Sequence, residues 1–260
     1  MKELHQRTQF IDLTGTTPDK LAIGTFGPAG SGKTRLTVTM PGKTGVIPLD
    51  RKQRRTIENA AAEMKLPKGK IIFPKDDFVR LAKPMELVMM DQESAMKFYR
   101  EHVNRIKDAI FTLAERKDVT SISIDPGTQL CEDVLFANYG RDQKIYPRDR
   151  GAYNSEMKQI LASIQHKHVV IPFESRAIWK NDKPTDKTEW VGWSKLDYNV
   201  NVICEQLGPP HTAKNPDHDF SLTIRLCQDR PDLIGETILL DENITFEMLA
   251  TTIYPDGEWG

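Results

Sequence analysis

The chain has 260 residues, of which 38% are hydrophobic and 28% are charged, and its formal net charge is −1. This composition is globular and allows one α/β domain with an appendage, or two small domains. The charge excludes a polycation, so any contact with nucleic acid or a membrane surface must come from a local patch. The three cysteines form no C-x-x-C pair, which argues against a zinc cage or a disulfide framework.

No stretch of the chain approaches 18 uninterrupted apolar residues, and the first ten residues contain no apolar core of a signal peptide. Transmembrane helices and secretory signals both need such a run. We therefore expect a soluble protein of a reducing compartment, located in the cytoplasm and without a membrane partner.

Predicted strands and helices alternate along most of the chain. The expected strands are residues 21–26, 46–49, 70–73, 119–124 and 169–173, and the expected helices are residues 33–40, 53–65, 94–117, 130–139 and 154–164. In the longest helix, Tyr99, Val103, Ile106, Ile110 and Leu113 recur at steps of four and three and form one apolar stripe. The alternation predicts an α/β fold with a mostly parallel sheet covered by helices on both faces.

Beyond Trp193 the pattern changes to strands without intervening helices, expected at residues 200–207, 220–226 and 237–240. These strands suit an antiparallel C-terminal extension at one edge of the parallel core. No internal repeat or linker composition divides the chain. The sequence therefore predicts an N-terminal extension over residues 1–20 and one domain over residues 21–260.

A glycine-rich loop between the first predicted strand and helix matches the pattern G-x-x-x-x-G-K-[ST]. The loop consists of Gly27, Pro28, Ala29, Gly30, Ser31, Gly32, Lys33 and Thr34. In such a loop the backbone N–H groups surround the β-phosphate, the lysine reaches the β- and γ-phosphates, and the final hydroxyl binds Mg²⁺. The motif lies where this mechanism needs it, so the sequence predicts a P-loop that binds ATP and Mg²⁺.

A second ligand for the metal is expected at the end of a buried strand. Asp125, which follows Ser121-Ile122-Ser123-Ile124, fits this position. Asp125 also begins the sequence Asp-Pro-Gly, which is a good turn signal by itself. Both interpretations can hold together.

Five segments resemble phage-encoded RecA-like P-loop ATPases, a family that includes single-strand annealing and recombination proteins. They are GPAGSGKT, SISIDPGT, NYGRDQKIYPRDRGAYNSEMKQIL, HVVIPFESR and GWSKLDYNVNVICEQL, and the resemblance extends over residues 21–235. The resemblance implies a RecA-like core, ATP-dependent action on single-stranded DNA, and assembly into a homo-oligomeric ring or filament.

The resemblance also suggests catalytic carboxylates beside Lys33. RecA-like ATPases commonly carry a glutamate after the strand that follows the P-loop helix, and this chain has Asp50 there, within the sequence LDRK. An aspartate is one methylene shorter, and a misplacement of about 1 Å can cost a hundredfold in rate. Asp50 could instead be a strand-end cap. Glu174, after the strand at residues 169–173, occupies the usual sensor position beside the γ-phosphate.

Two basic segments could contact partners. Residues 176–195 mix cations with tryptophans, and the candidate contacts with DNA are Arg176, Lys180, Trp190 and Trp193, because cations neutralise phosphates and aromatic rings stack on bases. The alternative is a solvated loop whose tryptophans pack against edge strands. In residues 141–150, Arg148 or Arg150 could be an arginine finger that reaches the ATP of a neighbouring subunit.

Three functions remain open on the sequence. The favoured one is an ATP-hydrolysing protein that acts on single-stranded DNA in phage recombination or annealing. Because Asp50 replaces a glutamate, a non-hydrolysing, ATP-gated DNA-binding or scaffold module is the first alternative, and a small-molecule phosphotransferase is the second. The histidines and aspartates of residues 211–219 match no standard set of metal ligands.

Overall fold

The computed structural model describes residues 18–75, 78, 89–141, 145–208, 220–240 and 244–259. Most of the predicted N-terminal extension and the whole of the loop at residues 209–219 lie outside these residues. Within them, no helix is both long and apolar enough to cross a membrane.

The centre of the fold is a sheet in the order β3-β2-β4-β5-β1-β7-β8-β9, with β6 paired to β5 outside this path. Its strands are β1 Ala22–Phe26, β2 Thr44–Pro48, β3 Ile71–Ile72, β4 Ser121–Asp125, β5 His168–Lys180, β6 Lys183–Val191, β7 Val202–Leu207, β8 Phe220–Cys227 and β9 Thr237–Leu240. The pairs from β3 to β7 are all parallel, and β8 and β9 continue the sheet in antiparallel pairing. The mostly parallel α/β sheet with an antiparallel extension is therefore confirmed.

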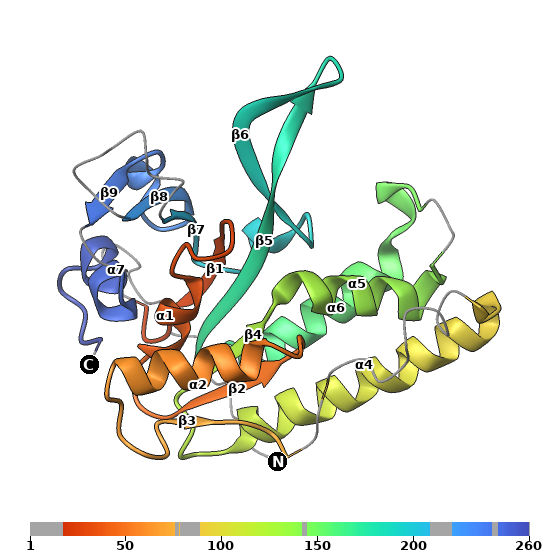
Figure 1. Cartoon of the computed structure of the whole chain (residues 1–260), viewed down its shortest axis with the longest axis horizontal. Helices are drawn as coiled ribbons and strands as arrows, with labels where there is room; N and C mark the ends of the chain where they lie inside the picture. Colours follow the sequence, from red (N-terminus) through yellow and green to blue (C-terminus); the bar gives the residue numbers. More distant parts are fainter. Residues whose placement is uncertain are drawn as a thin grey trace, which may run out of the picture.

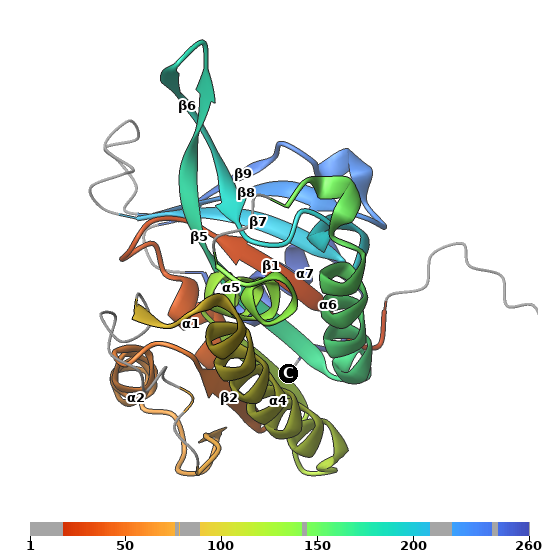
Figure 2. The same cartoon turned by 90° about the vertical axis from the view of Figure 1, so that its right-hand side faces the viewer.

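Helices cover both faces of this sheet (Figures 1 and 2). The helices are α1 Lys33–Val38, α2 Gln53–Glu63, α4 Gln92–Glu115, α5 Gly127–Tyr139, α6 Gly151–Ile164 and α7 Phe246–Ile253. One core packs α4, α5 and α6 against the sheet, while the other face carries α7 and α1 in a second core and α2 in a smaller cluster. The predicted stripe on α4 is confirmed, because all five of its side chains are buried in the first core.

Pro48 ends β2 without breaking the sheet. The N–H of Leu49 donates to the Asp125 carbonyl, so the neighbouring nitrogen of Pro48 points away from β4, toward β3. The pairing with β3 has already ended at Gly45. Among the strands that the structure describes, none therefore needs the missing N–H of the proline.

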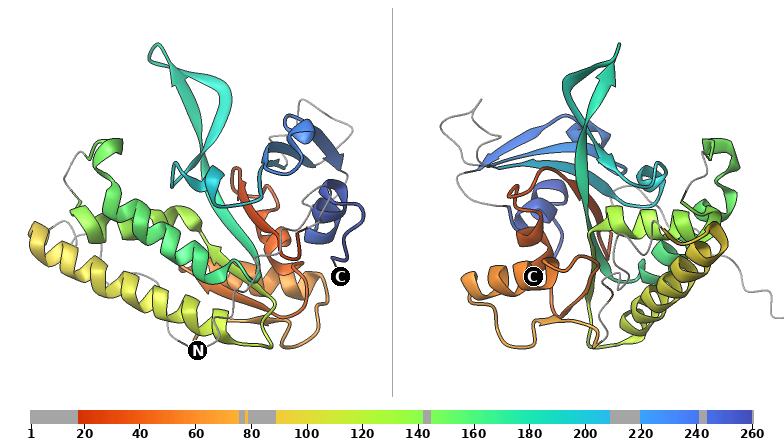
Figure 3. Two further views of the ribbon diagram at one scale, coloured as in Figure 1. Left: turned by 180° about the vertical axis from the view of Figure 1, so that it is seen from behind. Right: turned by 45° about the vertical axis from the view of Figure 1, so that its right-hand side comes forward.

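The C-terminal half of β5 leaves the sheet and pairs with β6 as a long hairpin. Asn181 and Asp182 connect the two arms, with φ angles of 53° and 59°, and two successive positive φ angles are the signature of a type I′ turn. Figures 1 and 2 show the hairpin as a twisted ribbon that projects from the body of the molecule, and the views in Figure 3 agree. The prediction that β5 ends at residue 173 is therefore wrong, and residues 174–191 are a hairpin instead of a loop.

Candidate functional site

The glycine-rich loop lies between the carboxyl end of β1 and the start of α1, as predicted. Gly30 and Gly32 have φ angles of 81° and 95°, a backbone region that L side chains rarely adopt. At Gly27 a Cβ atom would lie 2.0 Å from the carbonyl oxygen of Gln206 on β7. The loop can therefore take this path only with glycine at these positions.

Lys33 points back over the loop. Its Nζ donates to the carbonyl oxygens of Gly27 at 2.6 Å and Pro28 at 2.7 Å, and lies 3.4 Å from Ser31 Oγ. Burial lowers the pKa of Lys33, and the nearby carboxylates of Asp125 and Glu174 partly offset this effect. The ammonium group is thus held at the mouth of the loop by acceptors that a phosphate could replace.

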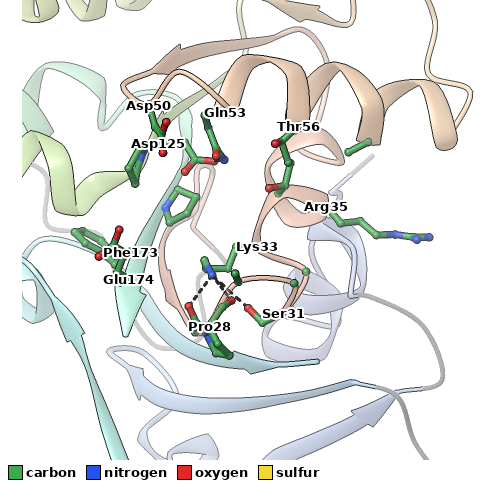
Figure 4. Close-up of a pocket in the computed structure, with 18 of the residues that line it drawn as sticks. Pro28, Ser31, Lys33, Arg35, Asp50, Gln53, Thr56, Asp125, Phe173 and Glu174 are labelled. Carbon is green, nitrogen blue, oxygen red and sulfur yellow. Dashed lines mark hydrogen bonds between the residues drawn. The ribbon is translucent and has the colours of Figure 1, made fainter. Parts of the chain in front are cut away.

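The loop forms one wall of a cavity of about 850 Å³. The ends of β2, β4 and β5 and one face of α2 form the other walls (Figure 4). All eight residues of the predicted phosphate-binding loop line this cavity, and so do Asp50, Asp125 and Glu174. The structure therefore brings the predicted phosphate-binding, metal-binding and catalytic residues together in one place.

Asp125 is the buried carboxylate of the site, with 3% of its surface exposed. Burial raises its pKa to about 7 and the Asp50 charge adds to this, while a hydrogen bond from Gln53 and the charge of Lys33 oppose it. The chain continues from Asp125 through Pro126 directly into α5, so the Asp-Pro-Gly sequence starts a helix instead of a turn between strands. A buried carboxylate with this pKa is a group that a bound cation would stabilise in its charged form.

Gln53 is a site residue that the sequence analysis missed. It begins α2, and its Nε2 donates to Asp125 Oδ2 (Figure 4). Its place three residues after Asp50, in the first turn of the helix after β2, is the only signal that could have indicated it. Gln53 fixes the orientation of the Asp125 carboxylate from across the cavity.

The two candidate catalytic carboxylates, Asp50 and Glu174, are both exposed to the cavity. Asp50 Oδ1 accepts the N–H of Lys52 at 3.1 Å, which is the contact expected of a cap at the end of a strand. Glu174 directly follows Phe173 in β5, and its charge acts on Lys33. Both side chains therefore reach the same cavity.

The oxygen donors of the cavity suit Mg²⁺. The hydroxyl of Thr34 and the carboxylates of Asp125 and Asp50 all line it, and Mg²⁺ is usually held by one or two carboxylates together with phosphate oxygens and water. In the part of the chain that the structure describes, no three His, Cys, Asp or Glu side chains are grouped to hold a metal alone. The residues present therefore fit a metal that arrives with a nucleotide.

The tryptophans of residues 176–195 differ in their surroundings. Trp193 is 0% exposed, and its Nε1 donates to Asn154 Oδ1 at 2.8 Å. Trp190 is half-buried, packs against Phe26 with ring centroids 6.0 Å apart, and donates to the Trp193 carbonyl. The predicted stacking of Trp193 on DNA bases is therefore wrong, because its ring is enclosed in the core, and Trp190 is a packing residue. Trp179, near the hairpin tip, is 66% exposed.

The two predicted cationic contacts lie on the hairpin arm of β5. Arg176 pairs with Glu189 on the opposite arm, with Nε 2.9 Å from Oε1. Lys180 is exposed beside the turn. Both side chains are accessible to a partner, and the charge of Arg176 is partly compensated within the hairpin.

Arg148 and Arg150, the predicted arginine fingers, do not line the cavity of their own chain. They lie between α5 and α6, in and after the short helix η1 Pro147–Asp149, at the other end of the molecule from α1 (Figure 1). The Arg148 side chain is 83% exposed, and its guanidinium lies 5.6 Å from the ring centroid of Tyr146. Contact with the ATP of a neighbouring subunit remains a prediction.

The fold and the site define a class: an α/β protein with a mostly parallel sheet flanked by helices, compatible with the Rossmann and P-loop folds, and with a glycine-rich loop at the carboxyl end of β1. Comparison of the sequence with protein-family models and with curated protein sequences gives no match.

Proposed function

We propose that this chain is a RecA-like P-loop ATPase that binds ATP with Mg²⁺ and acts on single-stranded DNA. The observation that carries the proposal is the convergence of Lys33, Asp125, Asp50 and Glu174 on one cavity. These residues come from four segments far apart in the sequence. A shared ligand with several negative charges and a metal explains why an ammonium group and three carboxylates meet there.

The strand order supports the RecA-like type. β5 lies between β1, which precedes the P-loop, and β4, which ends at Asp125. A sensor residue must end a strand between these two if it is to face the γ-phosphate, and Glu174 follows the last residue paired to β1. The intervening strand is thus what places Glu174 at the site.

The proposed chemistry is hydrolysis of the bond between the β- and γ-phosphates. The loop N–H groups bind the β-phosphate, and Lys33 exchanges the carbonyls of Gly27 and Pro28 for phosphate oxygens. Thr34 and Asp125 would hold Mg²⁺, which when bound would supply neutralisation of the charge on the phosphates. Asp50 or Glu174 orients a water and accepts its proton as the water oxygen bonds to the γ-phosphorus, which releases ADP and phosphate.

The hairpin is the proposed contact with DNA. At its far end Trp179 is 66% exposed and Ile178 is 37% exposed, beside the exposed Lys180, Lys183 and Lys187. Residues 174–191 contain four basic and four acidic side chains, so the formal charge of the hairpin is zero. Charge neutralisation by the hairpin is therefore weak, and stacking of bases on Trp179 must supply most of the affinity.

Replacing Trp179 with alanine tests this contact. We expect the affinity for a fluorescent oligothymidylate, measured by anisotropy, to fall about 5- to 150-fold, because one base–aromatic stack is worth about 1–3 kcal/mol. Trp179→Phe should keep most of the affinity, and Tyr198→Ala, which removes an exposed aromatic ring outside the hairpin, should not change it. Equal affinities of wild type and Trp179→Ala would remove the hairpin from the proposed DNA site.

The release of phosphate from ATP, measured with single-stranded DNA, duplex DNA and no polymer, tests the whole function. We expect Mg²⁺-dependent hydrolysis that single-stranded DNA stimulates more than duplex DNA does. ATP binding without phosphate release under all three conditions would favour the non-hydrolysing module. Consumption of ATP that requires a small acceptor and ignores DNA would favour the phosphotransferase.

A further inference from the structure

One buried hydroxyl joins the nucleotide cavity to the root of the hairpin. Thr128 is 5% exposed. Its Oγ1 donates to the carbonyl of Val191 at 2.8 Å and accepts the N–H of Glu174 at 2.9 Å. Glu174 and Val191 are partners at the first rung of the hairpin, so a single side chain contacts the outgoing arm and the returning arm at once.

Thr128 is also close in sequence to β4, the strand that ends at the proposed metal ligand Asp125. Thr128 lies in the first turn of α5, three residues after Asp125. The backbone around it is packed closely, because a Cβ atom on Gly127 would lie 2.4 Å from Ile171 Cγ2, and one on Gly192 would lie 2.9 Å from the Phe173 ring. Little free space therefore remains between the start of α5 and β5 to accommodate a shift of Asp125 relative to β5.

Two further contacts tie the same root to neighbouring strands of the site. Trp190 packs on Phe26, the residue that precedes the P-loop. Thr188 donates to Glu205 on β7, and Arg225 also donates to that carboxylate. The hairpin root therefore contacts the strand before the P-loop, β7, and the start of α5 after Asp125. Of these three contacts, only the one from Thr128 includes a hydrogen bond with the backbone of Glu174.

We propose that Thr128 is a positioning residue that holds Glu174 in place for ATP hydrolysis and couples nucleotide binding to the hairpin. This inference rests on the proposed ATPase function. Thr128 does not line the cavity, so its action on a nucleotide is indirect, through the backbone of Glu174. Removal of the hydroxyl should therefore change turnover and the hairpin response more than nucleotide affinity.

The variant Thr128→Val keeps the shape of the side chain and removes the hydroxyl. We expect its kcat to fall about 10- to 100-fold, because displacements of about 1 Å near the reacting groups have effects of this size. Its KM for ATP should change less than about threefold, because the contacts that bind ATP equally in the ground state and the transition state are retained. Thr128→Ser should restore kcat. Thr112→Val is the matched control, because it removes a similar hydroxyl-to-carbonyl bond, to Asp108 at 2.7 Å, on α4 and outside the hairpin.

Hydrogen exchange of the amides of residues 174–191, with and without a non-hydrolysable ATP analogue and Mg²⁺, tests the coupling without turnover. In the wild type and in Thr128→Ser we expect the analogue to slow exchange in this segment severalfold, and in Thr128→Val we expect this effect to be lost. If Thr128→Val does not fold, the wild-type measurement still tests the coupling to the hairpin, and Thr128→Ser tests whether the hydroxyl is sufficient for it.

The possible results separate the two proposals. Failure of the wild type to bind ATP would overturn both the ATPase function and the coupling. Binding of the analogue without any change in hairpin exchange would overturn only the coupling. A folded Thr128→Val with wild-type kcat and an undiminished exchange response would overturn the role of Thr128, as would a folded Thr128→Ser that has lost both.

Discussion

Lys33→Ala is expected to abolish ATP turnover and to weaken ATP binding by about a hundredfold or more, as is typical when a preorganised group facing phosphate charge is removed. The reason is geometric, because Lys33 Nζ is the cation that the loop holds at its mouth, 2.6 Å from the Gly27 carbonyl. No other residue of the loop carries a charge. Its removal leaves the loop itself without a cation to face the phosphates.

The fold should survive this substitution. Gly27 and Pro28, whose carbonyls accept from Lys33, both line the cavity. Water can therefore replace the ammonium group, and the free energy of unfolding should change by less than about 1 kcal/mol. Titration with a fluorescent ATP analogue and measurement of phosphate release provide the comparison. Lys43→Ala is the control, since Lys43 pairs with Asp118 at 2.9 Å and precedes β2, at the opposite end of the sheet. Normal ATP binding and turnover by Lys33→Ala would rule out the P-loop assignment.

Trp193→Ala is expected to lower the free energy of unfolding by about 3–5 kcal/mol, the usual cost of truncating a buried aromatic side chain. Trp193 is fully buried in the core that contains α4, α5 and α6. The substitution opens a cavity and removes the donor to Asn154 Oδ1 on α6. Both effects act on the folded state and have no connection with a ligand.

Urea unfolding separates this role from that of Trp179. Trp193→Ala should shift the midpoint to lower urea with an unchanged m value. Trp179→Ala removes a mostly exposed side chain and should change the free energy of unfolding by less than about 0.5 kcal/mol. A Trp193→Ala protein as stable as the wild type would show that this ring is not part of the core.

Local features of the sequence were enough for the fold class and for the centre of the site. The stripe from Tyr99 to Leu113 predicted the buried face of α4 correctly, because helical periodicity depends on spacing alone. The P-loop pattern predicted a strand before Gly27 and a helix from Lys33, and both are present. Asp125 was also predicted from a local pattern, as a carboxylate that follows a run of buried strand residues.

Contacts between distant segments could not be predicted from local sequence patterns. Gln53 meets Asp125 and Thr128 meets Glu174 and Val191, and these meetings depend on the strand order, which no short-range pattern specifies. The hairpin was missed because Asn181-Asp182 is a weaker turn signal than Asn-Gly. Trp193 was predicted to contact DNA for a related reason: Trp193 and Trp179 have the same chemistry, and only the packing of the whole chain buries one and exposes the other.

The residue types and their spacing thus determine which groups make up the proposed phosphate-binding loop, because those groups lie within eight consecutive residues. The folded chain determines what surrounds them, because β5 must enter the sheet between β1 and β4 before Glu174 can reach the cavity and the hairpin can rise beside it. Backbone pairing between strands far apart in the sequence is the physical cause of that arrangement.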